Sequence, residues 1–208
     1  ETPEGNHMGA QAEDFLMASG KLQAMCYKEE IEAALRTPDF AGFQLLQLHD
    51  FPGQGTALVG ILDPFFDSKG YITPDEFSRF CNQTVPLARM DKRVFTNDET
   101  FHAGIEIAHF GERPLSDLDL ICRILNASGE ILHQAVLETD TIPVENAIPV
   151  GSIDLDLRDI TAAQKLTLEV NAEGTSISNS WDFWVYPSDI EPNRGEVYIT
   201  ERLDGKAE

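Results

Sequence analysis

Four polar side chains follow an apolar run in the first half of the chain and could together bind a small molecule. They are Gln47, His49, Asp50 and Gln54. Amide, imidazole and carboxylate groups can between them donate hydrogen bonds to neutral hydroxyl groups and accept hydrogen bonds from them. This combination suits a sugar, and we predict that the four residues bind a carbohydrate substrate. None of them is an obvious activated nucleophile, so we assign no catalytic residue.

The same residues also have a structural interpretation. Pro52 and Gly53 turn the backbone directly after the apolar run. His49 and Asp50 could then satisfy local backbone groups at the end of a core strand. This stretch alone does not decide between the sugar-binding interpretation and the structural one.

Motifs for covalent or metal-dependent chemistry are absent from the sequence. It contains no GxSxG, HExxH or P-loop motif, and no GxGxxG after a strand. Asp67–Phe77 resembles half of an EF-hand calcium loop, but two oxygen ligands are missing and Lys69 replaces one of them. The five histidines are scattered, and His102 and His109 would face opposite sides of one strand. We therefore expect no metal ion and no cofactor.

A helix, a strand and a second helix would position the polar residues. Apolar residues recur at spacings of three and four over Ala10–Arg36, which predicts a helix whose charged residues, Glu32 included, face solvent. Phe40–Leu48 is a nearly unbroken apolar run with the length of a strand buried on both faces. Thr73–Glu76 has the sequence of a capping box with proline at the first helical position, which predicts a helix ending near Asn82.

After Asn82 the apolar pattern changes from a helical period to strict alternation. Alternating segments recur about every ten residues between residues 87 and 187, with turn signals between them. About seven strands fit this stretch, which predicts an all-β sandwich. Trp181 and Trp184 are three positions apart on the last strand, so they should point to opposite faces, with at least one in the core.

Charge and composition restrict the partners. The 208 residues carry a formal net charge of −21. This charge repels nucleic acid and anionic membranes, so we expect neither as a primary partner, whereas a neutral carbohydrate is compatible. Cys26, Cys81 and Cys122 are widely spaced among apolar residues, which predicts buried free thiols and no disulfide framework. No run reaches the roughly 18 apolar residues of a membrane span.

The predicted elements divide the chain into three parts. Residues 1–86 hold the helix–strand–helix unit, residues 87–188 the sandwich, and residues 189–208 a polar joint with one further strand-like piece. The first part has one buried strand and no sheet, and the last part has a strand without a partner. We therefore expect the sequence to be a segment of a longer protein.

Several stretches of the sequence resemble family 2 glycoside hydrolases, the group of β-galactosidases, β-mannosidases and β-glucuronidases. Residues 46–52 (LQLHDFP) resemble the W-Q-L-N-D-x-W-P segment on the last barrel strand, and residues 42–46 match the approach to that strand. Residues 63–80 resemble the return into the final barrel helix. Residues 179–187 (NSWDFWVYP) resemble the last strand of the immunoglobulin-like domain that follows the barrel in bacterial members. The resemblance covers most of residues 10–190.

The resemblance implies an α+β composite, in which the end of a (β/α)8 barrel precedes an immunoglobulin-like antiparallel β-sandwich. It implies the C-terminal portion of an exo-acting β-glycoside hydrolase, which contributes one wall of the sugar site and has the rest of the parent barrel as its partner. The family's two catalytic glutamates lie on strands four and seven and would fall before residue 1, so the chain alone should be inactive. The family also favours a periplasmic or extracellular location.

Two positions depart from the family pattern, and two other functions remain open. Leu46 stands where a tryptophan lines the subsite for the cleaved sugar, and His49 stands where asparagine is usual, while Asp50 matches. One alternative is a non-catalytic carbohydrate- or protein-binding sandwich, whose stacking residues would be Trp181 or Trp184. The other is a self-contained α/β protein in which the strand predicted at residues 40–48 is paired inside a complete sheet.

Overall fold

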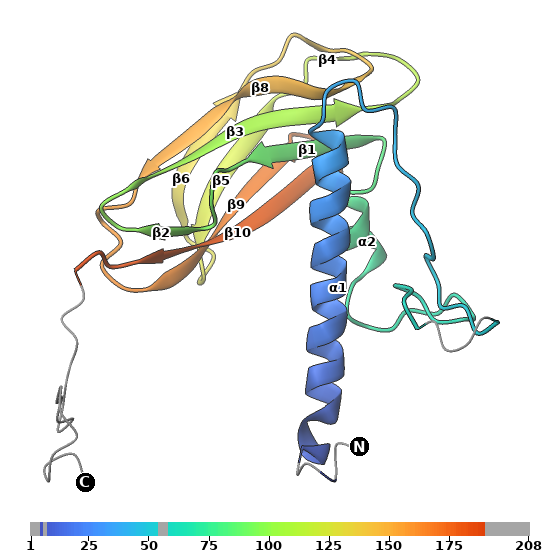
Figure 1. The fold of residues 1–208 in the computed structure, drawn as a ribbon. Helices are drawn as coiled ribbons and strands as arrows, with labels where there is room; N and C mark the ends of the chain where they lie inside the picture. The colour runs from blue at the N-terminus through green and yellow to red at the C-terminus, as the bar shows by residue number, and fades with distance from the viewer. Residues whose placement is uncertain (1–4, 6–7, 54–57, 190–208) are drawn as a thin grey trace, which may run out of the picture.

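The structure, a computed structural model, describes residues 5, 8–53 and 58–189 of the chain. One long helix comes first, and strands form most of the chain between residues 84 and 189 (Figure 1). The helical elements are η2 (Gly9–Gln11), α1 (Ala12–Leu35) and α2 (Pro74–Ser78). The strands are β1 (Thr84–Arg89), β2 (Val94–Thr96), β3 (Thr100–His109), β4 (Leu115–Ser116), β5 (Leu120–Asn126), β6 (Ile131–Leu137), β7 (Thr141–Ile142), β8 (Glu145–Asp156), β9 (Gln164–Ala172) and β10 (Ser178–Tyr186).

Two β-sheets enclose one hydrophobic core. One sheet has the antiparallel order β1-β3-β8, and the other has the order β2-β10-β9-β5-β6, in which the short β2 runs parallel to β10. Phe101 of β3 and Phe183 of β10 stack with ring centroids 4.0 Å apart, so the inner faces of the two sheets meet at this contact. β4 and β7 form a separate two-stranded sheet. This arrangement is the β-sandwich that the alternating pattern predicts.

The period of two in the sequence determines which side chains face the core. In β10, Asn179, Trp181, Phe183 and Val185 are buried, and the residues between them are more exposed. The same alternation runs along β5 and β9. Seven strands have six or more residues, as predicted, and the other three are shorter. Trp181 is buried and Trp184 is partly exposed, so the two tryptophans point to opposite faces, as expected.

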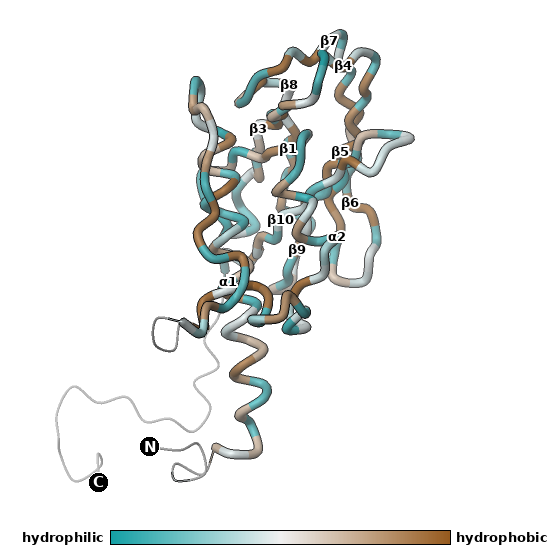
Figure 2. Tube along the Cα trace, turned by 90° about the vertical axis from the view of Figure 1, so that its right-hand side faces the viewer, coloured by the Kyte–Doolittle hydropathy of each residue, from teal (hydrophilic) through white to brown (hydrophobic). Residues whose placement is uncertain are grey.

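The C-terminal half of α1 packs against the sandwich, and its N-terminal half projects beyond the strands (Figure 1). Ile31 and Leu35 share a second hydrophobic cluster with Phe80, Val85 and Leu87. This cluster joins α1 to β1 and to the turn that follows α2. Hydrophobic residues also recur along the projecting half of α1, where no strand covers them (Figure 2).

Glu32 holds α1 on the sandwich, which corrects the prediction that this residue faces solvent. Its side chain is fully buried. Trp181 Nε1 and Asn179 Nδ2, both from β10, donate hydrogen bonds to its two oxygens at 2.7 and 2.8 Å. Lys28 and Arg36, one turn to either side on α1, form ion pairs with the same carboxylate. Four donors therefore surround one buried charge, which is what a carboxylate in a protein interior requires.

Lys28 shares the burial of this carboxylate. Its ammonium group also lies 4.8 Å from the centroid of the Trp181 ring, within the range of a cation–π contact. Burial lowers the pKa of Lys28 below its usual value, while the neighbouring Glu32 acts in the opposite direction. The helix and β10 are thus joined by a charged network as well as by apolar contacts.

α2 begins as the sequence predicts and ends earlier. The Thr73 hydroxyl accepts a hydrogen bond from the Glu76 amide at 3.2 Å, and the Glu76 carboxylate accepts one from the Thr73 amide at 2.8 Å. Pro74 occupies the first helical position, so the predicted capping box is confirmed. The helix ends at Ser78, short of Asn82, because the chain must then turn into β1.

The buried strand predicted at Phe40–Leu48 is not formed, and the structure does not show the end of a barrel. These residues have no regular secondary structure, Leu46 is 78% exposed, and Gln47 adopts a positive φ of 66°. Isolated bridges link Leu62 to His49 and to Ser68. An apolar run can only remain a strand where neighbouring strands satisfy its backbone groups, and among the described residues none lies beside this run. The alternative of a complete sheet around residues 40–48 is therefore wrong for the described part of the chain.

We predict that replacing Glu32 with alanine lowers the free energy of unfolding by about 3–5 kcal/mol, because Lys28 would remain buried without a counter-charge. Urea unfolding followed by tryptophan fluorescence measures the change. The control is Glu30→Ala, an exposed position on the same helix, which should stay within about 0.5 kcal/mol of the parent chain. Equal stability of the two variants would contradict the role given to Glu32.

Candidate functional site

Asp50, one of the four predicted sugar-binding residues, is buried and held by groups of this chain. Its Oδ1 atom accepts hydrogen bonds from the Gly60 amide at 2.9 Å and from Lys69 Nζ at 2.8 Å. Lys69 Nζ also donates to the Gly60 carbonyl at 2.8 Å. A side chain on Gly60 could not fit, because its Cβ would lie 2.2 Å from the His49 carbonyl carbon. The carboxylate therefore closes the loop between residues 50 and 69.

The same network continues to α1. The Tyr71 hydroxyl donates to Gln23 Oε1 at 2.8 Å and lies 3.1 Å from the Gly60 carbonyl oxygen. Gln23 Nε2 in turn donates to the Val59 carbonyl. Gly20 leaves room for this arrangement, since a Cβ there would be 2.3 Å from the Tyr71 ring. We call the group Asp50, Gly60, Lys69, Tyr71 and Gln23 the polar clamp.

Electrostatics favour the ionised form of Asp50. Burial raises its pKa, but the hydrogen bonds from Lys69 and from the Gly60 amide, together with the charge of Lys69, outweigh burial and lower the pKa below its usual value. The pKa of Tyr71 is raised, first by burial and then by the charge of Asp50. At neutral pH the clamp thus holds an anionic carboxylate and a neutral phenol.

Of the other predicted residues, Gln47 and His49 are less buried, and no hydrogen bond joins either side chain to Asp50. The His49 ring stacks on Phe66 with centroids 4.3 Å apart and remains partly exposed. Gln47 is also partly exposed, and Gln54 lies outside the described residues. Sugar binding by these four residues remains a prediction.

Large apolar side chains are exposed around the predicted site. We call the exposed apolar residues between positions 40 and 66 the apolar strip: Phe40, Phe43, Leu46, Leu48, Phe51, Leu58, Val59, Phe65 and Phe66. Four more are exposed on α1: Phe15, Leu16, Leu22 and Met25. Exposed apolar groups concentrated in this way are uncommon on a free-standing protein and are typical of a surface that is covered by a partner.

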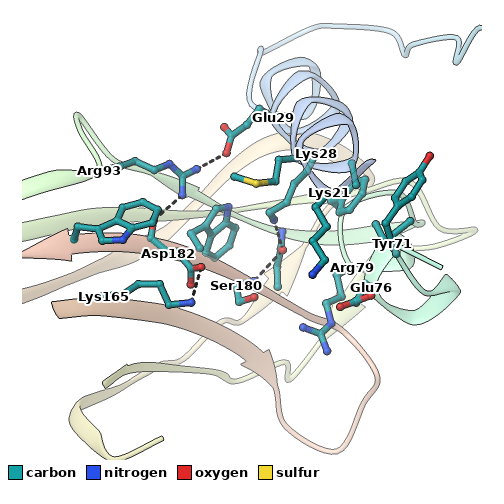
Figure 3. A pocket seen from close by; sticks show the side chains of 17 residues that line it. Lys21, Lys28, Glu29, Tyr71, Glu76, Arg79, Arg93, Lys165, Ser180 and Asp182 are labelled. Carbon is teal, nitrogen blue, oxygen red and sulfur yellow. Dashed lines mark hydrogen bonds and ion pairs between the residues drawn. The ribbon is translucent and has the colours of Figure 1, made fainter. Parts of the chain in front are cut away.

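A cleft between α1, the region of α2 and β10 is the feature that the sequence did not predict (Figure 3). Its volume is about 640 Å³. Lys21 reaches it from α1, Arg79 from the C-terminal end of α2, and Trp184 from β10. These residues are up to 163 positions apart in the chain, so no local motif connects them. Of these three residues only Trp184 gave a signal, as one of the two tryptophans predicted to lie on opposite faces of the last strand.

The histidines and cysteines complete the list of chemically reactive groups. His102 is exposed and pairs with Asp154, whereas His109 is buried, so the two face opposite sides, as predicted. Cys122 is buried, and burial raises its pKa to about 11. Cys26 is exposed, which contradicts the prediction that all three thiols are buried.

The described residues contain neither a cluster of metal ligands nor a membrane-spanning helix. No group of three or more His, Cys, Asp or Glu residues is placed to hold a metal ion in the part of the chain that the structure describes. No helix within residues 8–53 and 58–189 is long and apolar enough to cross a membrane.

Comparison with known proteins gives one family match and distant structural similarity. A family model described as "Domain of unknown function (DUF8488)" matches residues 99–187. No curated protein matches the chain. The family match lies within the sandwich and extends from the turn before β3 to the end of β10.

Solved structures similar to the chain come from several classes of protein. An activated Escherichia coli alpha-2-macroglobulin is 14% identical with a TM-score of 0.39, over 49% of this chain and 8% of that one. The Pseudomonas fluorescens alkylpurine DNA glycosylase AlkC is 11% identical with a TM-score of 0.34, over 54% and 33%. A Parabacteroides merdae β-glucuronidase is 9% identical with a TM-score of 0.36, over 50% and 14%. The chain thus spans a third or less of each of these proteins, and similarity at this level assigns no function.

We expect low pH to weaken the hydrogen bonds that Asp50 accepts in the polar clamp. A carboxylate whose pKa is lowered by folding stabilises the folded state above its unfolded pKa, and this contribution is lost as the pH falls through the lower, folded pKa. We therefore predict that the Gly60 amide, which donates to Asp50, loses protection against hydrogen exchange below about pH 4. NMR-detected exchange between pH 5 and pH 2 measures the protection factor.

Two substitutions distinguish protonation of Asp50 from other effects of low pH on the chain. Asp50→Asn should lower the protection of the Gly60 amide about tenfold at pH 5 and remove most of its pH dependence. Asp67→Asn, which alters an exposed carboxylate in the same loop, should leave both unchanged. If Asp50→Asn retained the pH dependence of the parent chain, another group would control the loop.

Proposed function

We propose that this chain is the C-terminal part of an exo-acting β-glycoside hydrolase, in which it supplies one wall of the sugar site and an accessory β-sandwich. The observation that carries the proposal is the apolar strip. It lies on the segment whose LQLHDFP sequence resembles the last barrel strand of family 2 glycoside hydrolases. The residues that resemble a strand buried on both faces are therefore those that this chain leaves uncovered.

Burial of the apolar strip would provide the energy for docking. Burying one large apolar side chain contributes about 1.5–3 kcal/mol, so several exposed phenylalanine and leucine residues favour a covered state strongly. A strand in a parallel barrel is covered on one side by the barrel interior and on the other by helices. We propose that residues 40–48 form such a strand when the rest of the barrel provides strands on both sides.

Within this arrangement the polar clamp positions the end of the barrel strand. Ligand sites of barrels lie at the C-terminal ends of the strands, which is where Gln47, His49 and Asp50 occur. The carboxylate of Asp50 is occupied by Lys69 and the Gly60 amide, so we assign it a positioning role. Direct contacts to sugar hydroxyl groups fall to Gln47, His49 and Gln54.

The catalytic carboxylates are proposed to lie outside this chain. A retaining glycosidase needs two carboxyl groups about 5–5.5 Å apart that can reach the substrate. The two buried carboxylates of the described residues, Glu32 and Asp50, are each bound by cations of the chain. Glu32 is in addition enclosed by Asn179 and Trp181. Neither carboxylate is free to act as an acid or a nucleophile, and the chain contributes binding and positioning.

Hydrolysis of 4-nitrophenyl β-glycosides tests the proposal. We expect the full-length gene product that contains this chain to hydrolyse at least one β-galactoside, β-mannoside or β-glucuronide, and residues 1–208 alone to hydrolyse none. In the full-length product, His49→Ala should raise KM or lower kcat/KM about tenfold or more, because it removes a proposed sugar contact. The control is His102→Ala, an exposed histidine on the sandwich.

Two results would contradict the proposal. One is turnover by residues 1–208 alone that is abolished by mutating a carboxylate within them. The other is a full-length product that is folded and inactive on all these glycosides.

A further inference from the structure

We propose that the cleft between α1, α2 and β10 is a second saccharide site, separate from residues 47–54, and that it binds an oligosaccharide bearing an acidic group, a carboxylate or a sulfate ester. Lys21 and Arg79, whose side chains form no ion pair with a described residue, line this cleft, and so does the partly exposed Trp184. That the ligand is a saccharide rests on the proposed function. That it is anionic rests on the charges of the cleft.

The charge of the cleft differs from that of the chain. Five of the 15 basic residues of the chain line it, together with three acidic residues, which gives a balance of +2 in a protein whose formal net charge is −21. The basic residues are Lys21, Lys28, Arg79, Arg93 and Lys165. Such a concentration of positive charge against the overall field creates a local attraction for an anion.

Three of the five cations already have partners. Arg93 binds the Glu29 carboxylate and the Asp182 carbonyl. Lys165 binds the Asp182 carboxylate at 2.9 Å. Lys28 belongs to the buried network around Glu32. These pairs leave two basic residues of the cleft for a ligand.

The side chains of Lys21 and Arg79 form no ion pair or hydrogen bond with any described residue. Figure 3 shows Lys21 pointing down from α1 and the guanidinium of Arg79 below it, and both residues line the cleft. The nearby Glu76 is held in the capping box, where the hydrogen bonds with Thr73 and, to a smaller extent, the charges of Arg79 and Lys21 lower its pKa. A guanidinium and an ammonium group that line one cleft are suited to a carboxylate or a sulfate.

An aromatic surface lies at the other end of the cleft. Trp181 is buried beneath Lys28, so its ring is not available for stacking. Trp184 is partly exposed on the outer face of β10 and lines the cleft. The four positions from Ser180 to Trp184 span about 13 Å along a strand. That length exceeds one sugar ring, so we infer a ligand of at least two residues, with one ring on Trp184 and its acidic group near Lys21 and Arg79.

Isothermal titration calorimetry of the full chain tests this site. The probes are tetragalacturonate, which carries carboxylates, a carrageenan tetrasaccharide, which carries sulfate esters without carboxylates, and cellotetraose, which is neutral. We expect at least one acidic probe to bind, cellotetraose not to bind, and the affinity to fall as sodium chloride is raised. The acidic probe that binds more tightly identifies the acidic group.

Variants connect binding to the cleft. Arg79→Gln and Trp184→Ala should each weaken binding of the acidic probe about tenfold or more, because one removes a charge-assisted contact and the other the stacking surface. Arg158→Gln, an exposed arginine outside the cleft, should bind as the parent does. Circular dichroism establishes that each variant is folded.

The proposal is overturned if neither acidic probe binds, if cellotetraose binds equally well, or if Arg79→Gln leaves the affinity unchanged. Its failure is distinguishable from failure of the proposed function. If the full-length product is an active glycosidase but residues 1–208 do not bind acidic oligosaccharides, only the proposal of a second site is contradicted. If residues 1–208 bind acidic oligosaccharides but the full-length product hydrolyses no β-glycoside, only the proposed glycosidase activity is contradicted.

Discussion

The buried carboxylate of Glu32 is the interaction on which the arrangement of this chain depends. A charge in a protein interior is tolerated only where donors surround it, and here α1 and β10 each supply two. The geometry of those four donors fixes where the helix lies on the sandwich. Because α1 also carries Gln23 of the polar clamp and Lys21 of the cleft, both regions take their positions from this contact.

The two ends of α1 have different surroundings. Its C-terminal half is joined to the sandwich by Glu32 and by the cluster around Ile31 and Leu35. Its N-terminal half carries exposed apolar residues and meets the segment that bears the apolar strip through Gln23, Val59 and Tyr71. The helix thus connects the β-sandwich, whose core is complete, to an exposed apolar surface that is suited to pack against another part of a protein. This division agrees with the proposal that the first part of the chain completes a barrel.

The elements that depend on local pattern could be predicted from the sequence. Period-three-to-four spacing located α1, alternation located the long strands, and the Thr73 capping box located the start of α2. Long-range contacts could not be predicted. Glu32 follows Lys28 and two other glutamates, which is the usual pattern of a solvated helix face, and its burial depends on Asn179 and Trp181, almost 150 residues later.

At the candidate sites, too, the sequence did not indicate the long-range contacts. The apolar run at residues 40–48 is typical of a buried strand, but a strand also needs neighbours, and the sequence pattern of one segment contains no information about them. Asp50 was singled out by its place after that run, whereas its partner Lys69 stood out only as an unsuitable calcium ligand. Lys21 and Arg79 share a cleft only because α1, the region of α2 and β10 all border it.

Amide hydrogen exchange at residues 40–48 tests the central claim most directly, that this segment becomes a barrel strand in the full-length gene product. The measurement compares residues 1–208 alone with the full-length product under the same conditions. We predict fast exchange in the chain alone, where these residues form no strand. In the full-length product, where ladder hydrogen bonds would form, we predict protection of at least about a hundredfold. Equally fast exchange in both would contradict it.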